Sequence, residues 1–159
     1  MKKLILSPVV FLLIVVFSSC KLMPKEKEEA KKEDVKKTWW KEATVYQIYP
    51  RSFKDSDADG VGEVKGIASR LDYIKSLGIN AVWLNPVYAS PNKDNGYDIS
   101  DYENIQPQYG SMQDFDTLLK GFHARGIKVM MDMVLNHCSD EHRWFREAKK
   151  SRNSPYYNY

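Results

Sequence analysis

The sequence predicts an α/β fold in which parallel strands alternate with helices, as in the N-terminal part of an eight-stranded β/α barrel. Apolar and β-branched runs end in Pro or in polar residues, and stretches with apolar residues at helical spacing lie between them. The loops that follow the predicted strands are longer than the turns that precede them. Because long loops on one face of such a barrel carry active sites, this pattern favours an enzyme over a scaffold.

The predicted strands account for about three of the eight in a closed barrel. They are expected over residues 39–50, 79–84 and 127–135. The last begins as a short apolar run, which is typical of a strand buried on both faces. A closed barrel needs about 250 residues, so residues 39–159 are expected to hold only its N-terminal part.

Helices are predicted between these strands and after the last one. The first is expected over residues 66–78, where apolar side chains recur at helical spacing and a Gly ends the pattern. The second begins at the capping pair Ser111 and Asp114 and runs to Gly126. A short third helix is expected over residues 141–150, followed by an irregular segment.

The first 38 residues are expected to lie outside this fold. Residues 1–19 combine a basic start, an apolar run and small residues before Cys20, which is typical of a bacterial lipoprotein signal. Cys20 would then carry lipid and hold an exported protein on a membrane, in the periplasm or at the cell surface. Phe17 departs from the Leu usual in such signals, and an uncleaved membrane anchor is the alternative.

Residues 20–38 are rich in Lys and Glu and lack aromatic side chains, which indicates a solvated tether. The first 38 residues hold nine Lys and five acidic residues, so the formal charge of +3 for the whole chain becomes −1 for residues 39–159. The basic balance therefore gives no reason to expect a nucleic-acid partner. The only other cysteine, Cys138, would be left single, so no disulfide framework is expected.

The loop after the first strand carries acidic residues at alternating positions around a Gly turn. Such oxygen ligands can converge on one hard cation, and a flexible cage of this kind suits Ca²⁺ better than Mg²⁺. The candidate ligands are Asp55, Asp57, Asp59, the Val61 carbonyl and Glu63. Gly66 stands where an EF-hand would need a Glu, so a single calcium loop or an acidic surface turn are the two interpretations.

Two further loops carry candidate binding residues. Asp94 and Tyr97, on a Gly-containing loop, can offer a sugar a hydrogen-bond acceptor and a ring face, and an ordinary turn is the alternative. Asp132, Asn136 and His137 follow the third apolar run, where the carboxyl end of a barrel strand faces the active site. A metal site that uses His137 and His142 fits no strong zinc pattern.

In their order, these segments resemble the α-amylase family of glycoside hydrolases, which adopts the TIM barrel fold. The resemblance covers residues 39–159 and is strongest to the α-glucosidase and oligo-1,6-glucosidase branch. It is carried by Val45-Tyr-Gln-Ile-Tyr-Pro-Arg-Ser-Phe, the loop 55–63 with Gly66-Ile67, Asn85-Pro-Val-Tyr-Ala-Ser-Pro, Asn95-Gly-Tyr-Asp-Ile-Ser-Asp-Tyr, Tyr109-Gly and Asp132-Met-Val-Leu-Asn-His.

The resemblance implies a role for each candidate residue. Asp94 would accept hydrogen bonds from the non-reducing glucose of a malto- or isomalto-oligosaccharide, Tyr97 would stack under its ring, and His137 would donate to one of its hydroxyls. Asp132 would hold the basic residue that orients the nucleophile, and Asn136 would brace the turn. The acidic loop matches the family's calcium site, although Glu63 stands where that branch usually has Asp.

The family hydrolyses with retention, through a carboxylate nucleophile and a carboxyl acid on later strands. Neither Gly-Phe-Arg-x-Asp nor a His-Asp pair occurs in these 159 residues, so this chain alone is expected to be inactive and to stop where an inserted domain begins. The alternatives are a transglycosylase or isomerase of the same family and a non-catalytic barrel ectodomain. The sequence does not decide between hydrolysis and these alternatives, and it does not decide whether the bond is α-1,4 or α-1,6.

Overall fold

The computed structural model of the chain describes residues 38–159. The predicted signal peptide (residues 1–19), the lipidation site Cys20 and nearly all of the tether (residues 20–38) lie outside the described residues. Between residues 38 and 159, no helix combines the length and the apolar character needed to cross a membrane.

Three parallel strands form the central sheet, as predicted. They are β1 (Val45–Ile48), β2 (Ala81–Leu84) and β5 (Lys128–Met131), in the order β1-β2-β5. The register is continuous across the sheet, with Val45 opposite Ala81 and Ala81 opposite Lys128. Because all three strands run in one direction, their carboxyl ends meet at one edge, and the loops that leave this edge can share a site.

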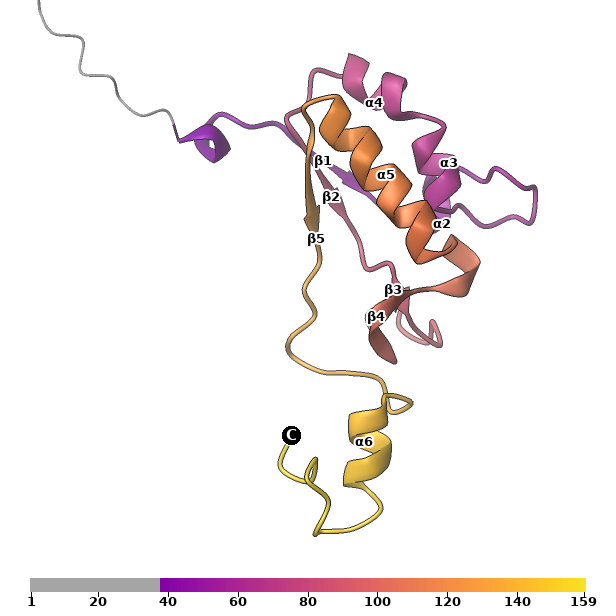
Figure 1. Cartoon of the computed structure of the whole chain (residues 1–159), viewed down its shortest axis with the longest axis vertical. Coiled ribbons are helices and arrows are strands. Elements are labelled where there is room, and N and C mark those ends of the chain that lie inside the picture. Colours follow the sequence, from indigo (N-terminus) through magenta and orange to yellow (C-terminus); the bar gives the residue numbers. More distant parts are fainter. Residues whose placement is uncertain (1–37) are drawn as a thin grey trace, which may run out of the picture. The chain divides into compact units, whose positions relative to one another are not determined.

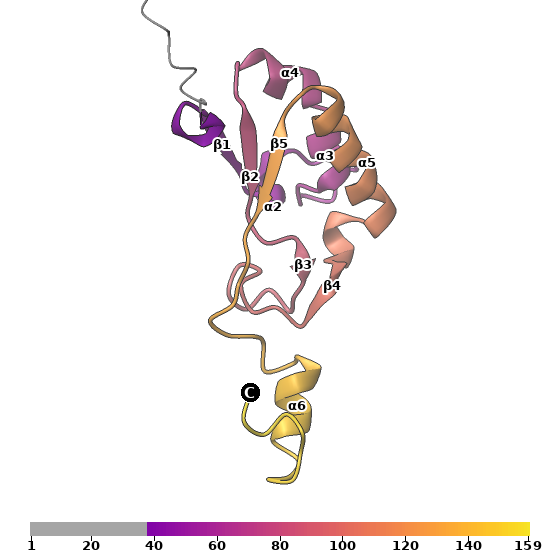
Figure 2. The ribbon, with the colours of Figure 1, turned by 60° about the vertical axis from the view of Figure 1, so that its left-hand side comes forward.

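Helices cover one face of this sheet (Figures 1 and 2). They are α2 (Pro50–Phe53), α3 (Val64–Ala68), α4 (Leu71–Ser76) and α5 (Met112–Ala124). The predicted capping pair is present, since Ser111 Oγ accepts from the Asp114 backbone N–H and Asp114 accepts from the Ser111 N–H. The largest fully buried side chains of this core include Ile48, Ile67, Ile74, Val82, Leu84, Tyr109, Leu118, Phe122 and Ile127.

The third strand is not buried on both faces, contrary to the prediction. Alternate residues of a strand point to opposite faces, and only one face of this sheet packs against helices. Lys128 and Met130 therefore lie exposed on the uncovered face, whereas Val129 and Met131 are partly buried against the core.

All three predicted strands are longer than the observed ones, and the second begins at Ala81 instead of residue 79. Residues Trp39–Lys41 form a 3₁₀ helix, η1, so the first strand begins only at Val45. The third ends at Met131 instead of residue 135. The hydrogen-bonded ladder between β2 and β5 ends where the Asp132 N–H donates to the Leu84 carbonyl at 3.2 Å. Strand β2 is followed there by Asn85-Pro86, and Pro86 has no N–H with which to continue the pairing.

The helix predicted over residues 66–78 is two helices, α3 and α4. The chain tightens between them, where the Arg70 N–H bonds the Ile67 carbonyl at 2.9 Å and Ser69 Oγ donates to the Gly66 carbonyl at 2.6 Å. A Ser hydroxyl that bonds the preceding turn competes with regular helix, which explains the break.

The loop after β2 contains structure that the sequence did not indicate. Two short antiparallel strands, β3 (Tyr88–Ala89) and β4 (Asp101–Ile105), pair with Tyr88 opposite Ile105, and a 3₁₀ helix, η2 (Pro107–Tyr109), follows. The hairpin holds the segment with Asp94 and Tyr97. Beyond β5, the predicted last helix is present as α6 (Arg143–Ala148).

Candidate active site

The carboxylate of Asp132 is the centre of a hydrogen-bond network at the carboxyl edge of the sheet. Trp83 Nε1 donates to its Oδ1 at 2.7 Å, and the Tyr97 hydroxyl donates to its Oδ2, also at 2.7 Å. The Tyr88 hydroxyl donates to the Asp132 backbone carbonyl at 3.1 Å. Side chains from three separate segments therefore fix Asp132 immediately after β5.

The network continues across the sheet to β1. Asn85 Nδ2 donates to the Tyr97 hydroxyl at 3.2 Å, and Gln47 Nε2 donates to Asn85 Oδ1 at 3.0 Å. The hydrogen bond to Asp132 is the largest cause of the raised pKa of Tyr97, because the charged carboxylate favours the protonated phenol. This row of polar groups runs over all three strand ends, where a barrel enzyme has its active site.

Asp94 lies beside this network on the exposed part of the loop. Its carbonyl accepts from the Tyr97 N–H at 2.9 Å, while its carboxylate accepts no hydrogen bond from another residue within 38–159. An exposed carboxylate with free acceptor positions next to an aromatic ring can bind the hydroxyls of a sugar.

His137 and Asn136 come from the segment after β5. Asn136 Nδ2 donates to His137 Nδ1 at 3.2 Å, so His137 carries its proton on Nε2, which faces the Tyr97 carbonyl at 3.2 Å. The Tyr102 hydroxyl also bonds the His137 carbonyl at 2.9 Å. The structure thus brings the predicted residues Tyr97, Asp132, Asn136 and His137 together.

The acidic loop gathers part of its predicted metal ligands. Carboxylate oxygens of Asp55, Asp57 and Glu63 lie within 4.8 Å of one another. Asp55 also accepts from the Gly60 N–H at 2.9 Å and from the Ala58 N–H at 2.6 Å. The bond from Gly60 is the largest cause of the lowered pKa of Asp55, which keeps this carboxylate charged.

Glu63 is the buried member of this cluster. Its Oε1 accepts from the Ser56 N–H at 2.8 Å and from the Ser56 hydroxyl, while its Oε2 is buried without a hydrogen-bond partner. An unpaired buried carboxylate oxygen is costly unless a cation lies next to it, so this donor set fits a hard metal ion. Asp59 is not in the cluster, and its Oδ1 accepts from the Val61 N–H at 2.7 Å.

No other group of three potential ligands occurs within residues 38–159, so the alternative metal site at His137 and His142 is not formed there. His142 is buried, and its Nδ1 accepts from the Trp144 N–H at 3.1 Å at the start of α6. Burial lowers the pKa of His142, which keeps this acceptor neutral.

Several residues of the network escaped prediction. They are Trp83, Asn85 and Tyr88, which contact Asp132 or Tyr97, and Gln47, which contacts Asn85. The one available signal was position, because Asn85 follows a strand directly and strand ends face the site. The partners themselves could not be predicted without the sheet register.

Comparison with known proteins agrees with this geometry. The profile described as "Alpha amylase, catalytic domain" matches residues 47–159. An oligo-1,6-glucosidase of Parageobacillus thermoglucosidasius is 58% identical over 125 residues, which are 79% of this chain and 22% of the relative. An α-glucosidase of Candida albicans is 57% identical over 117 residues, 74% of this chain and 20% of the relative. The chain thus spans about a fifth of the curated relatives it matches.

Solved structures give the same assignment. Crystal structures of variants of the trehalulose synthase MutB, one of them in complex with glucose, match with a TM-score of 0.75 and 55% identity over 76% of this chain and 22% of theirs. An isomaltulose synthase variant of Erwinia rhapontici NX5 matches with a TM-score of 0.75 and 54% identity over 77% of this chain and 22% of its own. The fold is the N-terminal part of a (β/α)8 barrel, and the chain belongs to the α-amylase catalytic-domain family of glycoside hydrolases.

Proposed function

We propose that this chain supplies the glucose-binding part of the active site of a retaining enzyme that acts on terminal α-glucosidic bonds of oligosaccharides. The observation that carries the proposal is the joined network of Asp132, Tyr97 and His137 beside the free carboxylate of Asp94. The names of the matched relatives, oligo-1,6-glucosidase and α-glucosidase, support the same substrate class.

Each residue has a role in this proposal. Asp94 accepts hydrogen bonds from the non-reducing glucose, and Tyr97 stacks against its ring. His137 donates its Nε2 proton to a hydroxyl, in place of the 3.2 Å contact with the Tyr97 carbonyl. Asp132, which Trp83 and Tyr97 hold in place, orients the basic residue next to the nucleophile. Asn136 fixes the His137 tautomer through its hydrogen bond to Nδ1. The nucleophile and the acid would come from later strands of the longer enzyme, which would also cover the open face of the sheet.

A chimaera tests this function directly. The segment aligned with residues 39–159 is exchanged into the Parageobacillus oligo-1,6-glucosidase, and hydrolysis of isomaltose and maltose is measured. The chimaera should be active, and Asp94→Ala in it should lower kcat/KM by roughly 10- to 150-fold, the effect of losing hydrogen bonds to a charged group. Glu147→Ala, an exposed carboxylate on α6, is the matched control and should leave kcat/KM unchanged.

Residues 21–159 alone should show no turnover, because the two catalytic carboxyl groups are absent from them. A chimaera that folds to the parent's stability but hydrolyses neither sugar would contradict the proposal and favour a non-catalytic barrel. Turnover by the isolated chain would contradict its dependence on later strands.

A transglycosylating or isomerising enzyme is the second candidate. The solved structures that match include trehalulose and isomaltulose synthases at 54–55% identity, about as high as the match to the glucosidases. The products that the longer enzyme itself forms from sucrose separate the two candidates, because in the chimaera the later strands belong to the host. Glucose and fructose indicate hydrolysis, whereas an isomeric disaccharide indicates isomerisation.

We also propose that the acidic loop binds Ca²⁺ through Asp55, Asp57 and Glu63, with Asp59 and the Val61 carbonyl as further candidate ligands. The clustered carboxylates and the unpaired Glu63 Oε2 support this proposal. Bound Ca²⁺ should raise the unfolding temperature, as any ligand of the folded state does. Glu63→Gln should abolish that increase, whereas Glu103→Gln should retain it.

Export and lipidation at Cys20 are proposed on the sequence of residues 1–20. Labelling with a radioactive fatty acid in a bacterial host tests them. The wild-type chain should incorporate the label, Cys20→Ser should not, and Cys138→Ser should behave as the wild type.

A further inference from the structure

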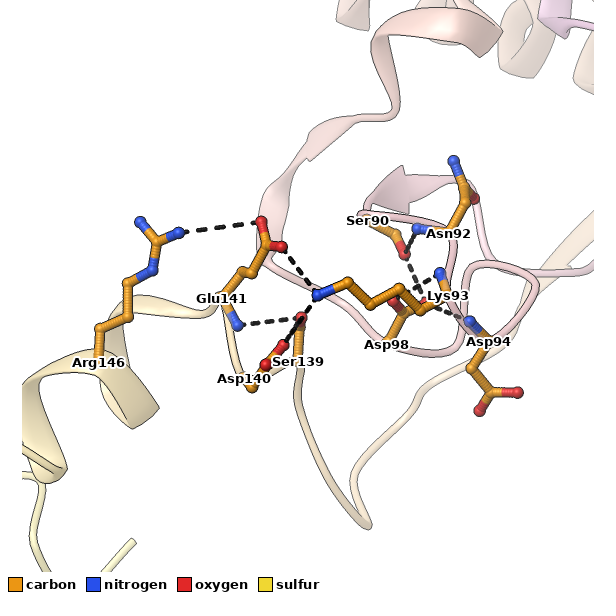
Figure 3. Close-up of polar contacts among 9 residues, drawn as sticks. All are labelled: Ser90, Asn92, Lys93, Asp94, Asp98, Ser139, Asp140, Glu141 and Arg146. Carbon is orange, nitrogen blue, oxygen red and sulfur yellow. Dashed lines mark hydrogen bonds and ion pairs between the residues drawn. The ribbon is translucent and has the colours of Figure 1, made fainter.

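The loop that carries Asp94 is organised around the carboxylate of Asp98. Asp98 Oδ1 accepts from Ser90 Oγ at 2.8 Å and from the Asp94 N–H at 3.1 Å, and its Oδ2 accepts from the Lys93 N–H at 2.9 Å. Hydrogen bonds to a charged acceptor are roughly twice as strong as neutral ones. The two successive backbone amides that precede the Asp94 Cα therefore depend on one partly buried carboxylate (Figure 3).

Ser90 connects this loop to the buried structure beneath it. It is only 7% exposed, its N–H donates to Gln106 Oε1 at 3.0 Å, and its Oγ accepts from the Asn92 N–H at 2.9 Å. Asn92 and Asn95 have φ of 57° and 53°, a left-handed conformation that Asn tolerates better than most residues. The loop is thus a bent, hydrogen-bonded unit.

The side chain of Lys93 joins this unit to the segment that follows His137. Its Nζ lies 3.0 Å from Glu141 Oε1 and 3.5 Å from Asp140 Oδ1, and Arg146 lies 3.8 Å from the second oxygen of Glu141 (Figure 3). Glu141 is the largest cause of the raised pKa of Lys93. An exposed ion pair of this kind adds little to global stability. We expect the ion pair of Lys93 to affect instead how the loop that carries Asp94 is aligned with the segment that follows His137.

Two further contacts join the same two segments. The Ser139 N–H donates to the Ile99 carbonyl at 2.9 Å, and the side-chain Nε2 of His137 faces the Tyr97 carbonyl. The loop of residues 90–99 and the segment of residues 137–141 are therefore held together at three places. Asp94 lies on the first and His137 on the second.

We propose that Asp98 and Lys93 are positioning residues for sugar binding. Asp98 fixes the loop that presents Asp94, and Lys93 docks this loop on residues 139–141, so that Asp94 and His137 address the same sugar. The sugar-binding part of this inference rests on the proposed function. In Figure 3 the Asp94 carboxylate points away from the cluster, which leaves it accessible to a ligand.

Amide hydrogen exchange in the 159-residue chain tests the docking without any sugar. In Asp98→Asn, the amides of Lys93 and Asp94 should exchange at least about tenfold faster, because both lose a charged acceptor. In Lys93→Gln, the same amides should exchange about threefold faster at low salt, and the difference should vanish at about 1 M salt, where exposed charges are screened.

Two variants make this result specific. Lys93→Arg keeps the charge and should restore the wild-type rates. Lys150→Gln removes a comparable ion pair far from the loop, since Lys150 Nζ lies 2.6 Å from Glu147 at the end of α6, and should leave the loop unchanged. Exchange rates that are equal in the wild type, Asp98→Asn and Lys93→Gln would overturn the proposal.

A titration with isomaltose, followed by NMR, separates this inference from the proposed function. Lys93→Gln and Asp98→Asn should weaken binding by the factor by which they lower the docked fraction of the loop, because only the docked conformation binds. Full affinity in variants with an open loop would overturn the positioning role but leave sugar binding intact. A docked wild-type loop that shows no isomaltose binding would contradict the proposed function and, with it, the positioning role.

Discussion

The two faces of the β1-β2-β5 sheet both carry large apolar side chains but differ in what covers them. On one face, Ile48, Val82 and Leu84 are 0–1% exposed beneath the helices. On the other, Trp83 and Met130 lie side by side in register and are each 38% exposed. The difference shows that an apolar strand pattern predicts a strand, whereas its cover depends on the elements that pack on it.

The uncovered face is also the face that leads to the site. Trp83 points away from the helices, and its indole N–H donates to Asp132. The covered face therefore supplies the stability of the described residues, and the uncovered face supplies a scaffold for the polar network. Substitutions on the two faces should separate these roles.

The largest expected effect is in the covered face. Leu84→Ala removes a side chain that is 1% exposed, and such truncations typically lower the free energy of unfolding by about 2–5 kcal/mol. Met130→Ala, on the uncovered face of the adjacent strand, should cost less than about 1 kcal/mol because little burial is lost. Urea unfolding of both variants measures the difference. Equal losses would show that the uncovered face is buried in solution, for example by self-association.

A smaller effect is expected where the covering helices meet. A Cβ on Gly121 of α5 would lie 2.4 Å from Leu71 Cδ1, so Gly121→Ala forces the Leu71 side chain to move. Overpacking of this kind costs about 1–3 kcal/mol, less the gain in helix propensity from Ala. Asp116→Ala, on the exposed side of the same helix, is the control in the same urea measurement. A more stable Gly121→Ala variant would mean that this helix layer is loosely packed.

The sheet could be predicted from the sequence because its signals are local. The apolar run that became β2 ends at Asn85-Pro86, and the Ser111 capping pair marked the start of α5 correctly. The end of β5 could not be predicted, since Met133 and Leu135 continue the apolar pattern but have no strand beside them and are 67% and 83% exposed. Pairing with a neighbour, which the pattern does not encode, decides where a strand stops.

The sequence predicted several residues of the candidate site but not the hydrogen bonds that join them. Asp94, Tyr97, Asp132 and His137 were all expected from the sequence, whereas Trp83 was not. The contact between Trp83 and Asp132 joins residues 49 positions apart, and that between Tyr97 and Asp132 joins residues 35 apart. The first contact follows from the register of β2 against β5, and the second from the path of the loop between β3 and β4; a single sequence specifies neither.

The capping box of α5 gives the next smaller effect. Ser111→Ala removes the acceptor for the Asp114 N–H, and losing such a cap costs about 0.5–2 kcal/mol. Because α5 covers the sheet, the loss should appear in the global unfolding transition. Ser154→Ala, which removes a turn hydrogen bond to Tyr156 at the chain's end, should leave that transition unchanged. A global loss from Ser154→Ala would show that the last residues belong to the same cooperative unit.

The smallest effect distinguishes the two faces by the titration of their tyrosines. Burial is the largest cause of the raised pKa of Tyr109 in the core, whereas the hydrogen bond to Asp132 is the largest cause for Tyr97 at the site. Both raised pKa values mean that the folded chain holds a proton which the unfolded chain releases near pH 10. The stability that each tyrosine contributes is therefore complete below pH 10 and is lost as the pH rises through the folded pKa.

Asp132→Asn removes the charge but keeps the shape, so NMR titration should show a lower pKa for Tyr97 and an unchanged one for Tyr109. Asp94→Asn should shift neither tyrosine. A parallel shift of both would mean that Asp132 supports the core, and the separation of the two faces would then fail.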